Sequence, residues 1–120
     1  MQHSILLYVK DPLASAMFYQ KVLDDAALEA SPGFAMFMLN AGTMLGLWNR
    51  DGVEPAPMLQ PGSAEIGFHV ASNEEVEALQ QKWKSHNIPI IQSPTLMDFG
   101  YTFTAVDPDG HRLRVFATPS

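Results

Sequence analysis

The sequence contains an internal repeat, and this repeat limits the folds that the chain can adopt. Two stretches have the same order of predicted elements: a strand, a helix and then further strands. The strand that closes each stretch recurs after 68 residues, as Met44–Trp48 and Arg112–Phe116. Such a repeat in a chain of 120 residues predicts two copies of one βαβββ module, an α+β fold class. The opening strand and helix recur after 61 residues, at Ser4 and Glu65, Val9 and Val70, and Asp11 and Ser72.

Local signals define the elements of the first module. Ser4–Val9 alternates in the manner of a half-buried strand. Asp11 followed by Pro12 is typical of an N-cap and the first helical residue, and the helix continues to about Leu23. Phe34–Leu39 is a second strand, and a turn leads from it into the closing strand.

The second module carries a capping box. Ser72 is at the predicted N-cap and Glu75 follows three residues later. In a capping box the serine side chain accepts from the backbone N–H of the glutamate, and the glutamate side chain accepts from the backbone N–H of the serine. Asn87 can end this helix in the left-handed conformation. Strands are predicted on both sides of it, over Glu65–Val70 and Ile88–Gln92. The apolar face of the helix consists of Val76, Leu79 and Trp83, for which we expect core packing.

The chain ends in a predicted hairpin of Tyr101–Val106 and Arg112–Ala117. The four residues from Asp107 to Gly110 read Asp-Pro-Asp-Gly, a strong signal for a type I turn. In the last strand Arg112, Arg114 and Phe116 share one face. Two arginines on a strand face lie either in solvent or against an anionic or aromatic group, and the residues alone leave both readings open.

Composition excludes several classes of function. Thirteen acidic residues against seven basic ones give a net charge of −6, which disfavours nucleic acid and anionic membranes as partners. There is no cysteine, hence no disulfide and no thiolate chemistry. No apolar run approaches the roughly 20 residues that span a bilayer, and the N-terminus does not resemble a secretory signal. We therefore expect a cytoplasmic protein.

We expect residues 1–120 to form a single domain made of two modules, at about 1–50 and 63–120. The segment between them, about 51–62, contains Pro55, Pro57 and Pro61 and reads as a linker. Each module has one helix, which can cover only one face of its sheet. The other face remains for a ligand or a partner.

Three segments carry a resemblance to a known family: VKDPLASAMFYQKVL, EIGFHV and DFGYTFTAVDPDGHRLRVF. They resemble the vicinal oxygen chelate superfamily, which includes glyoxalase I, extradiol dioxygenases and bleomycin- and fosfomycin-resistance proteins. The resemblance covers nearly the whole chain. It implies paired βαβββ modules that form a curved mixed sheet around a cleft, usually in a homodimer. It does not choose an activity, since this fold hosts both catalysis and sequestration.

The resemblance also indicates where metal-dependent members keep their ligands. Those four places fall on Ser4, Gly46, Glu65 and Arg114 of this sequence, and only Glu65 can bind a metal ion. A catalytic divalent site needs about three protein ligands and an open position, and a guanidinium has no lone pair to donate. The chain is therefore expected to have no metal site and no cofactor, and binding is favoured over catalysis.

Four histidines are the remaining metal-ligand candidates. His3 precedes the first ligand position by one residue, so it serves only if a bulge shifts the strand. His69 shares the face of Glu65 and is interpreted as a polar cleft-wall residue. His86 and His111 are interpreted as solvated surface residues.

Alternation places an apolar cup on the faces that the ligand positions occupy. Trp48 shares a strand face with Met44 and Gly46, and the glycine is expected to leave room beside the indole. Phe34, or else Phe37 on the other face, adds bulk from the neighbouring strand. The predicted ligand-binding residues are Phe34, Met44, Trp48, Glu65, His69, Phe99, Tyr101, Phe103, Arg114 and Phe116.

Within the superfamily, the segments LGLW, EIGFHV, MDFGYTF and DPDGHRLRVF look most like antibiotic-binding members. The resemblance implies a metal-independent homodimer that sequesters a planar, aromatic, antibiotic-like molecule. The alternatives are a metal-dependent lyase, thiol transferase or dioxygenase of the same superfamily, and a structural dimer with an empty cleft.

Overall fold

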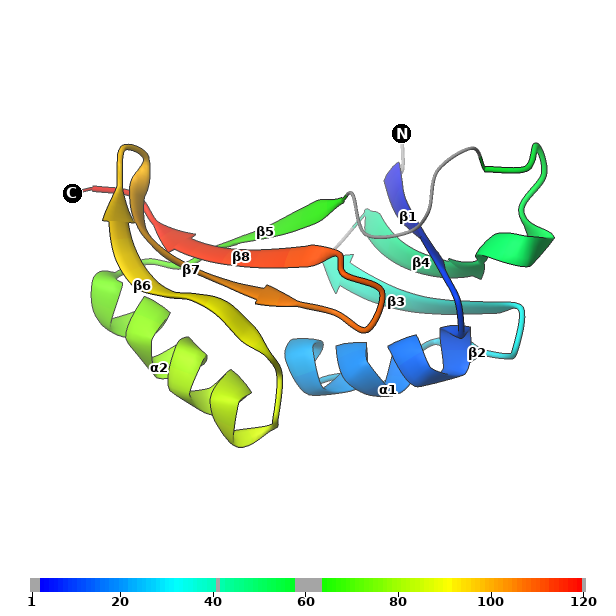
Figure 1. The fold of residues 1–120 in the computed structure, drawn as a ribbon, viewed down its shortest axis with the longest axis horizontal. Coiled ribbons are helices and arrows are strands. Elements are labelled where there is room, and N and C mark those ends of the chain that lie inside the picture. The colour runs from blue at the N-terminus through cyan, green and yellow to red at the C-terminus, as the bar shows by residue number, and fades with distance from the viewer. Residues whose placement is uncertain (1–2, 41, 58–63, 120) are drawn as a thin grey trace. The chain divides into compact units, whose positions relative to one another are not determined.

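The computed structural model describes residues 3–40, 42–57 and 64–119. The chain divides into two compact units, Met1–Pro61 and Gly62–Ser120. Each unit is one βαβββ module with a mixed four-stranded sheet, so the predicted fold class is confirmed (Figure 1). Within the predicted linker, Arg50–Gly52 forms a short 3-10 helix at its start, and residues 58–62 lie outside the described part of the chain.

The first module has its strands in the order β1-β4-β3-β2. β1 runs parallel to β4, and the other neighbours are antiparallel. Helix α1 packs against β3 and β4 and covers one face of this sheet. The elements are β1 (His3–Val9), α1 (Pro12–Leu23), β2 (Glu29–Ala30), β3 (Phe34–Asn40) and β4 (Thr43–Asn49).

Helix α1 begins where the Asp-Pro signal predicts. The Asp11 carboxylate accepts hydrogen bonds from the backbone N–H groups of Leu13 (3.1 Å) and Ala14 (3.3 Å), and Pro12 occupies the first helical position. The helix ends at Asp24, whose φ of 56° is left-handed. The buried apolar side chains of the sheet in this module are Leu7, Val9, Ala35, Phe37, Leu45 and Leu47.

The second module repeats this plan in the order β5-β8-β7-β6, with β5 parallel to β8. Helix α2 packs against β6, β7 and β8. Its buried apolar residues include Ile66, Val76, Trp83, Phe103, Leu113 and Val115. The elements are β5 (Glu65–His69), α2 (Asn73–Ser85), β6 (Ile90–Met97), β7 (Gly100–Val106) and β8 (Arg112–Ala117).

The cap of α2 is formed as predicted. Ser72 Oγ accepts from the backbone N–H of Glu75 at 3.2 Å, and the Glu75 carboxylate accepts from the N–H of Ala71 at 2.8 Å, one residue before the N-cap. Asn87 follows the helix with a φ of 61°. Trp83 lies at the centre of the core, with its ring edge-to-face against Phe68 and Phe103 at centroid distances of 5.8 and 5.3 Å.

The predicted turn between β7 and β8 is also present. The N–H of Gly110 donates to the Asp107 carbonyl at 3.1 Å, and Gly110 has a φ of 88° that favours glycine. The buried Asp107 carboxylate accepts from the N–H groups of Asp109 and His111. His111 is itself only 4% exposed, so its assignment to the solvated surface was wrong. Its Nδ1 accepts from the N–H of Ala64 at 3.4 Å, which anchors the start of β5.

β2 was not predicted from the sequence, and β6 differs from its predicted boundaries. β2 has only two residues, too few to show an alternation pattern. β6 continues to Met97, beyond the predicted Gln92, although Pro94 lies within it. β6 is an edge strand of its sheet, where a proline without an N–H donor is tolerated. Over the residues described, no helix has the length and apolar character needed to cross a membrane.

Candidate functional site

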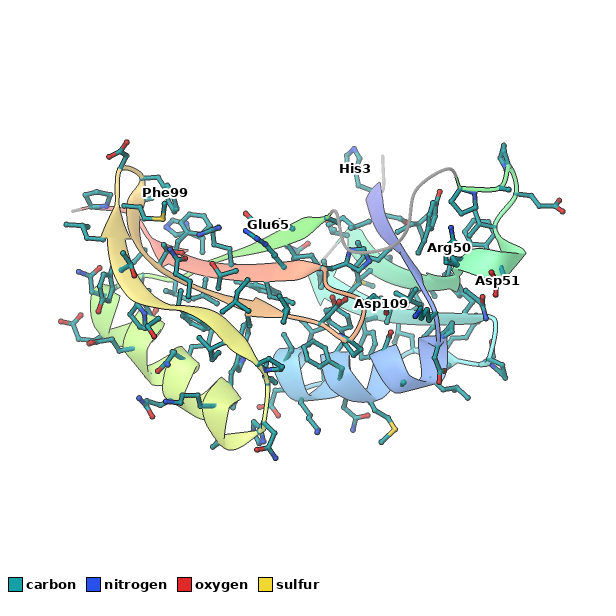
Figure 2. The ribbon with its side chains drawn as sticks, viewed as in Figure 1. His3, Arg50, Asp51, Glu65, Phe99 and Asp109 are labelled. Carbon is teal, nitrogen blue, oxygen red and sulfur yellow. The ribbon has the colours of Figure 1, made fainter. Side chains whose placement is uncertain are left out.

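The sheet of the second module has one face that α2 does not cover, which we call the second open face. Ile66 on β5 and Leu113 and Val115 on β8 are buried on the helix side. Alternation therefore places Glu65 and His69 of β5, and Arg114 and Phe116 of β8, on the opposite side. Glu65 and Phe99 project from this side, away from α2, in Figure 2. Four of the residues predicted from alternation thus share one surface.

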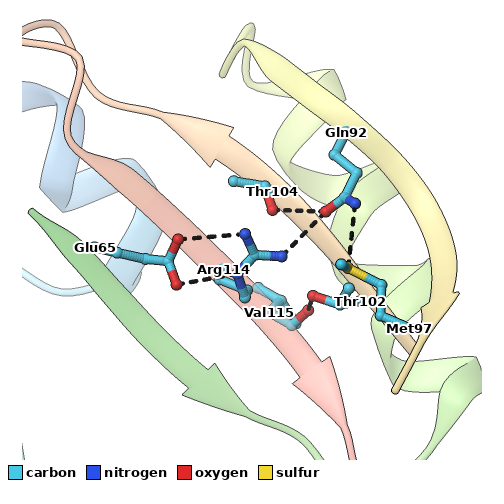
Figure 3. A network of polar contacts seen from close by, with 7 residues as sticks. All are labelled: Glu65, Gln92, Met97, Thr102, Thr104, Arg114 and Val115. Atoms are coloured by element: carbon cyan, nitrogen blue, oxygen red, sulfur yellow. Dashed lines mark hydrogen bonds and ion pairs between the residues drawn. The ribbon is translucent and has the colours of Figure 1, made fainter. Parts of the chain in front are cut away.

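A polar network lies on the second open face (Figure 3). Arg114 Nε donates to Glu65 Oε2 at 3.0 Å and Nη2 donates to Glu65 Oε1 at 3.3 Å, so the pair is bidentate. Arg114 Nη1 donates to Gln92 Oε1 at 3.2 Å, and the Thr104 hydroxyl donates to the same oxygen at 2.9 Å. The Arg114 side chain is 18% exposed and that of Glu65 43%. The guanidinium of Arg114 on β8 is therefore held by Glu65 on β5 and by Gln92 on β6. Thr104 on β7 contributes through its hydrogen bond to Gln92.

An aromatic cluster adjoins the network. The rings of His69 and Phe116 are stacked, with centroids 5.0 Å apart and planes 10° from parallel. Phe99 meets Phe116 edge-to-face at 6.1 Å, and the Arg114 guanidinium lies 5.8 Å from the centroid of the Phe99 ring. Phe99 is 42% exposed, and His69 is also exposed. The site therefore offers exposed ring surface beside a fixed cation.

Gly67 contributes to this arrangement by its lack of a side chain. It lies between Glu65 and His69 on β5 and pairs in register with Arg114. A Cβ atom at Gly67 would lie 3.4 Å from Cε1 of Phe116, so the ring extends close over the glycine. A side chain longer than that of alanine at this position would meet the ring of Phe116, so the position favours a small residue.

Tyr101 and Phe103 do not belong to the second open face. They share a face, as alternation predicts, but it is the helix-covered one: Phe103 is fully buried against Trp83. The Tyr101 hydroxyl donates to Glu77 Oε1 of α2 at 3.2 Å. Burial, and then the nearby Glu77 carboxylate, raise the pKa of Tyr101 above its ordinary value. We therefore remove both residues from the candidate site.

Two residues of the network, Gln92 and Thr104, were not anticipated from the sequence. Thr104 lies on the face of β7 opposite Phe103 and pairs in register with Arg114. The alternation of threonines with apolar residues in Thr102–Ala105 is the signal that could have placed Thr104 there. Gln92 had no such signal, because the pairing of β6 with β7 shifts register on either side of it.

The first module has a corresponding uncovered face, the first open face. Trp48 and Phe34 are partners in the β3–β4 register, and Met44 lies on the same face of β4. Tyr8 meets Trp48 edge-to-face at 6.4 Å. Phe37 is 1% exposed and packs in the core, so Phe34, not Phe37, is on the open side of β3. Trp48, Met44 and Phe34 are thus brought together within this module.

Gly46 does not leave free space beside Trp48, contrary to our expectation. Gly46 is buried, and a Cβ atom there would collide with Cδ2 of Leu6 and lie 3.0 Å from Cζ of Phe34. The Leu6 side chain from the neighbouring strand β1 occupies the space that the missing side chain leaves. The apolar side chain of Leu6 therefore fills the space beside Gly46.

The four positions implied for a metal do not fit a metal ion. Both carboxylate oxygens of Glu65 accept hydrogen bonds from Arg114. Leu6 and Phe34 cover Gly46. The pairing of β1 with β4 runs without a shift from His3 to Val9, so His3 and Ser4 point to opposite faces. His86 is exposed at the end of α2. Among the residues described, no three histidine, aspartate or glutamate side chains gather in a group suited to a metal.

The predicted pairing of Glu65 with Arg114 is confirmed, and its energetics can be tested. Glu65→Ala is expected to destabilise the fold more than Glu65→Ala/Arg114→Ala, because the single change leaves a largely buried guanidinium with only Gln92 as partner. Glu65 is well exposed, so the coupling is expected to be about 0.5–1 kcal/mol. A double-mutant cycle by urea unfolding measures it.

Arg112 provides the control for this cycle. It lies opposite Glu65 in the β5–β8 register but forms no ion pair within the described residues. The Glu65–Arg112 cycle should show no more than a few tenths of a kcal/mol of coupling. Equal coupling in both cycles would mean that general charge, not the bidentate contact, links these residues.

Comparison with known proteins supports one family. Residues 2–115 match the model of the Glyoxalase/Bleomycin resistance protein/Dioxygenase superfamily. The phenazine antibiotic resistance protein EhpR of Enterobacter agglomerans is 33% identical over 113 residues, which cover 92% of this chain and 86% of EhpR. A protein of Agrobacterium tumefaciens with a solution NMR structure is 43% identical, with a TM-score of 0.86 over 98% of this chain and 96% of that one. A glyoxalase/bleomycin resistance protein/dioxygenase from Nocardioides has a TM-score of 0.83 at 23% identity, covering 98% and 83% of the two chains, and shares the fold.

Proposed function

The chain belongs to the Glyoxalase/Bleomycin resistance protein/Dioxygenase superfamily, and from this premise we propose that it is a metal-independent binding protein. In this proposal it sequesters a planar aromatic, antibiotic-like molecule and lowers the free concentration of that molecule by mass action. On the second open face, the residues proposed to contact a ligand are His69, Phe99, Arg114 and Phe116 with Glu65. On the first open face, taken by itself, they are Phe34, Met44 and Trp48.

The observation that carries the proposal is the aromatic cluster beside Arg114. The stacked rings of His69 and Phe116 and the edge of Phe99 form a surface that matches the flat face of an aromatic ligand. Phe99 and Phe116 are large and apolar, partly exposed and in contact with each other, as expected of a contiguous binding patch rather than of scattered surface residues. Aromatic stacking supplies binding without any chemical step.

The resistance relative gives the proposal a ligand class to test. EhpR is a phenazine antibiotic resistance protein, and phenazine is a planar three-ring aromatic system. Such a ring system can stack on a side-chain platform of the kind that His69 and Phe116 form. We propose that the ligand of this chain is also a fused planar aromatic.

We further propose that the protein acts as a homodimer in the cytoplasm. Support for a second copy comes from the first open face, where Leu6 is 48%, Tyr8 37% and Met38 40% exposed, an apolar surface that association would cover. The cytoplasmic location rests on the sequence expectation alone. Size-exclusion chromatography with light scattering tests the oligomeric state.

Equilibrium dialysis against phenazine tests the proposed function directly. We expect saturable binding with a defined stoichiometry, measured by the absorbance of phenazine on both sides of the membrane. Linear, non-saturating uptake up to the solubility limit would contradict a built site and leave the fold with an empty face.

Metal content separates this proposal from a metal-dependent enzyme of the same superfamily. With one usable ligand among the four implied positions, the purified protein is expected to hold far less than one Zn²⁺, Ni²⁺, Mn²⁺ or Fe²⁺ per chain after dialysis against a weak chelator. Elemental analysis of the dialysed protein measures this. A stoichiometric ion that survives dialysis would favour the enzyme and overturn metal-independent binding.

A further inference from the structure

The guanidinium of Arg114 has more N–H donors than its contacts with other side chains use. An arginine side chain carries five N–H groups, and the contacts of Arg114 use three: Nε–H, one N–H of Nη1 and one of Nη2. Each terminal nitrogen therefore keeps one N–H with no partner among the described residues. The side chain is 18% exposed, so part of it faces solvent.

Gln92 adds another donor at the same place. Its amide oxygen accepts from Arg114 and Thr104, which fixes the orientation of the amide group. The amide nitrogen then points away from Arg114 and makes only a weak contact of 3.5 Å to the sulfur of Met97. An amide nitrogen has two N–H groups, so one is left for a ligand. The network in Figure 3 therefore has N–H donors left over on both Arg114 and Gln92.

The charged residues that β5 and β8 place on the second open face have a net charge of the same sign as these donors. Glu65 carries one negative charge and neutralises Arg114 through the bidentate contact. Arg112 lies on the same face of β8, opposite Glu65 in the register, and is exposed. These three residues together carry one excess positive charge on a protein whose net charge is −6. A local positive excess on an acidic protein favours an anion at this place.

The donors lie beside the rings. Arg114 is 5.8 Å from the centroid of Phe99, and Phe99 contacts Phe116. A ligand that stacks on the rings would thus bring the edge of its ring system to the guanidinium.

We propose that the ligand is a planar aromatic carboxylate whose carboxylate oxygens accept from Arg114 and Gln92 while its ring system stacks on His69, Phe99 and Phe116. This inference rests on the proposed function and specifies the chemical class of its ligand. In this proposal Glu65 holds the Arg114 side chain in place. The remaining N–H groups of Arg114 then bind the anionic edge of the ligand.

Equilibrium dialysis with matched probes tests this inference. The probes are phenazine, the 1- and 2-carboxylates of phenazine, and the two corresponding carboxamides, which keep the oxygen acceptor but not the charge. We expect the better of the two carboxylates to bind about tenfold to a hundredfold more tightly than phenazine and than its own carboxamide, as a charge-assisted hydrogen bond predicts. In Arg114→Gln this preference should fall to less than about threefold.

Further variants guard against a general loss of structure. Arg114→Lys keeps the charge but not the planar fork, and should retain part of the preference. Gln92→Glu adds a negative charge beside Arg114 and should also remove the preference. Lys84→Gln, exposed on α2, removes one positive charge away from the open face and should leave the preference unchanged. Thermal unfolding of each variant checks that it is folded under the dialysis conditions.

The outcomes separate the inference from the proposed function. If phenazine, its carboxylates and its carboxamides all bind wild type equally, the inference is overturned and the proposed function stands. If a carboxamide matches its carboxylate, the anionic class is wrong. If the carboxylate preference survives in Arg114→Gln, recognition lies elsewhere and the assignment to Arg114 fails. If none of the probes binds, both the inference and the proposed function are overturned.

Discussion

Replacement of Trp83 by alanine is expected to lower the free energy of unfolding by about 3–5 kcal/mol. The indole is 1% exposed and contacts Phe68 and Phe103 edge-to-face, so its removal leaves a large cavity between α2 and its sheet. Urea unfolding followed by far-ultraviolet circular dichroism measures the loss. A decrease of less than about 1 kcal/mol would mean that the core of the second module is not built around this residue.

Two variants define the cause of that loss. Trp83→Phe keeps an aromatic ring, and the buried Trp83 Nε1 has no hydrogen-bond partner in the described part of the chain, so this change should be clearly milder. Trp48→Ala makes the same deletion on the first open face, where the indole is only half-buried. It should cost much less stability and, as the proposed function requires, weaken binding of an aromatic ligand. If Trp48→Ala unfolds the protein and Trp83→Ala affects only binding, the two faces of the modules are assigned the wrong way round.

Replacement of Phe116 by alanine is expected to weaken the binding of phenazine by about tenfold to a hundredfold. Offset or stacked aromatic contacts contribute about 0.5–1.5 kcal/mol beyond burial, and the lost apolar contact adds a term of about 25 cal/mol per Å². Phe116 holds both the stack with His69 and the edge contact with Phe99, so its loss dismantles the whole ring surface. Equilibrium dialysis of phenazine with the variant gives the ratio of dissociation constants.

Phe18→Ala is the matched control for this prediction. Phe18 is also half-buried, but it lies on α1 and contacts Tyr19. The same deletion there should leave the affinity for phenazine within about twofold of wild type. Similar losses of affinity in both variants would indicate a general effect on folding, and the second open face would then lose its role as the binding surface.

The elements that could be predicted from the sequence are those with a strong local cause. Asp11-Pro12 and Ser72 place the helix starts within one residue, because capping depends on side chains next to the backbone groups that they satisfy. The Asp107–Gly110 turn is equally local. The repeat then identified the module, since one helix per four strands leaves few other arrangements.

The errors in the predicted site have a different origin. Alternation establishes which residues share a face, but not which face the helix covers. Tyr101 and Phe103 were therefore grouped correctly and assigned to the wrong side of β7. We expected His111 to be exposed because it follows a turn. Its backbone N–H instead donates to the buried Asp107 carboxylate, and its side chain is buried. Gln92 joins the network through a register shift between β6 and β7, and no pattern in a single strand encodes such a shift.

The Glu65–Arg114 pair could be predicted because the family resemblance places both residues at positions where metal-dependent members keep ligands to one ion. Residues that would converge on one ion must lie close together, whatever their identity, and a carboxylate and a guanidinium at such positions meet in the geometry that this structure has. Its third partner, Gln92, comes from outside the repeated positions and could not be reached by the same reasoning.

The two modules share an equivalent cross-strand pair in which one partner is glycine, but the glycine lies on opposite strands of the pair in the two modules. Leu6 on β1 faces Gly46 on β4, whereas Gly67 on β5 faces Arg114 on β8. A Cβ atom at Gly46 would collide with Leu6, so in that pair the two cross-strand partners cannot both be large. Mutations at such a pair are therefore epistatic. At the equivalent pair of the second module, a Cβ atom at Gly67 would meet the Phe116 ring at 3.4 Å, so a larger residue at position 67 is expected to change the ring surface before it affects the Arg114 side chain.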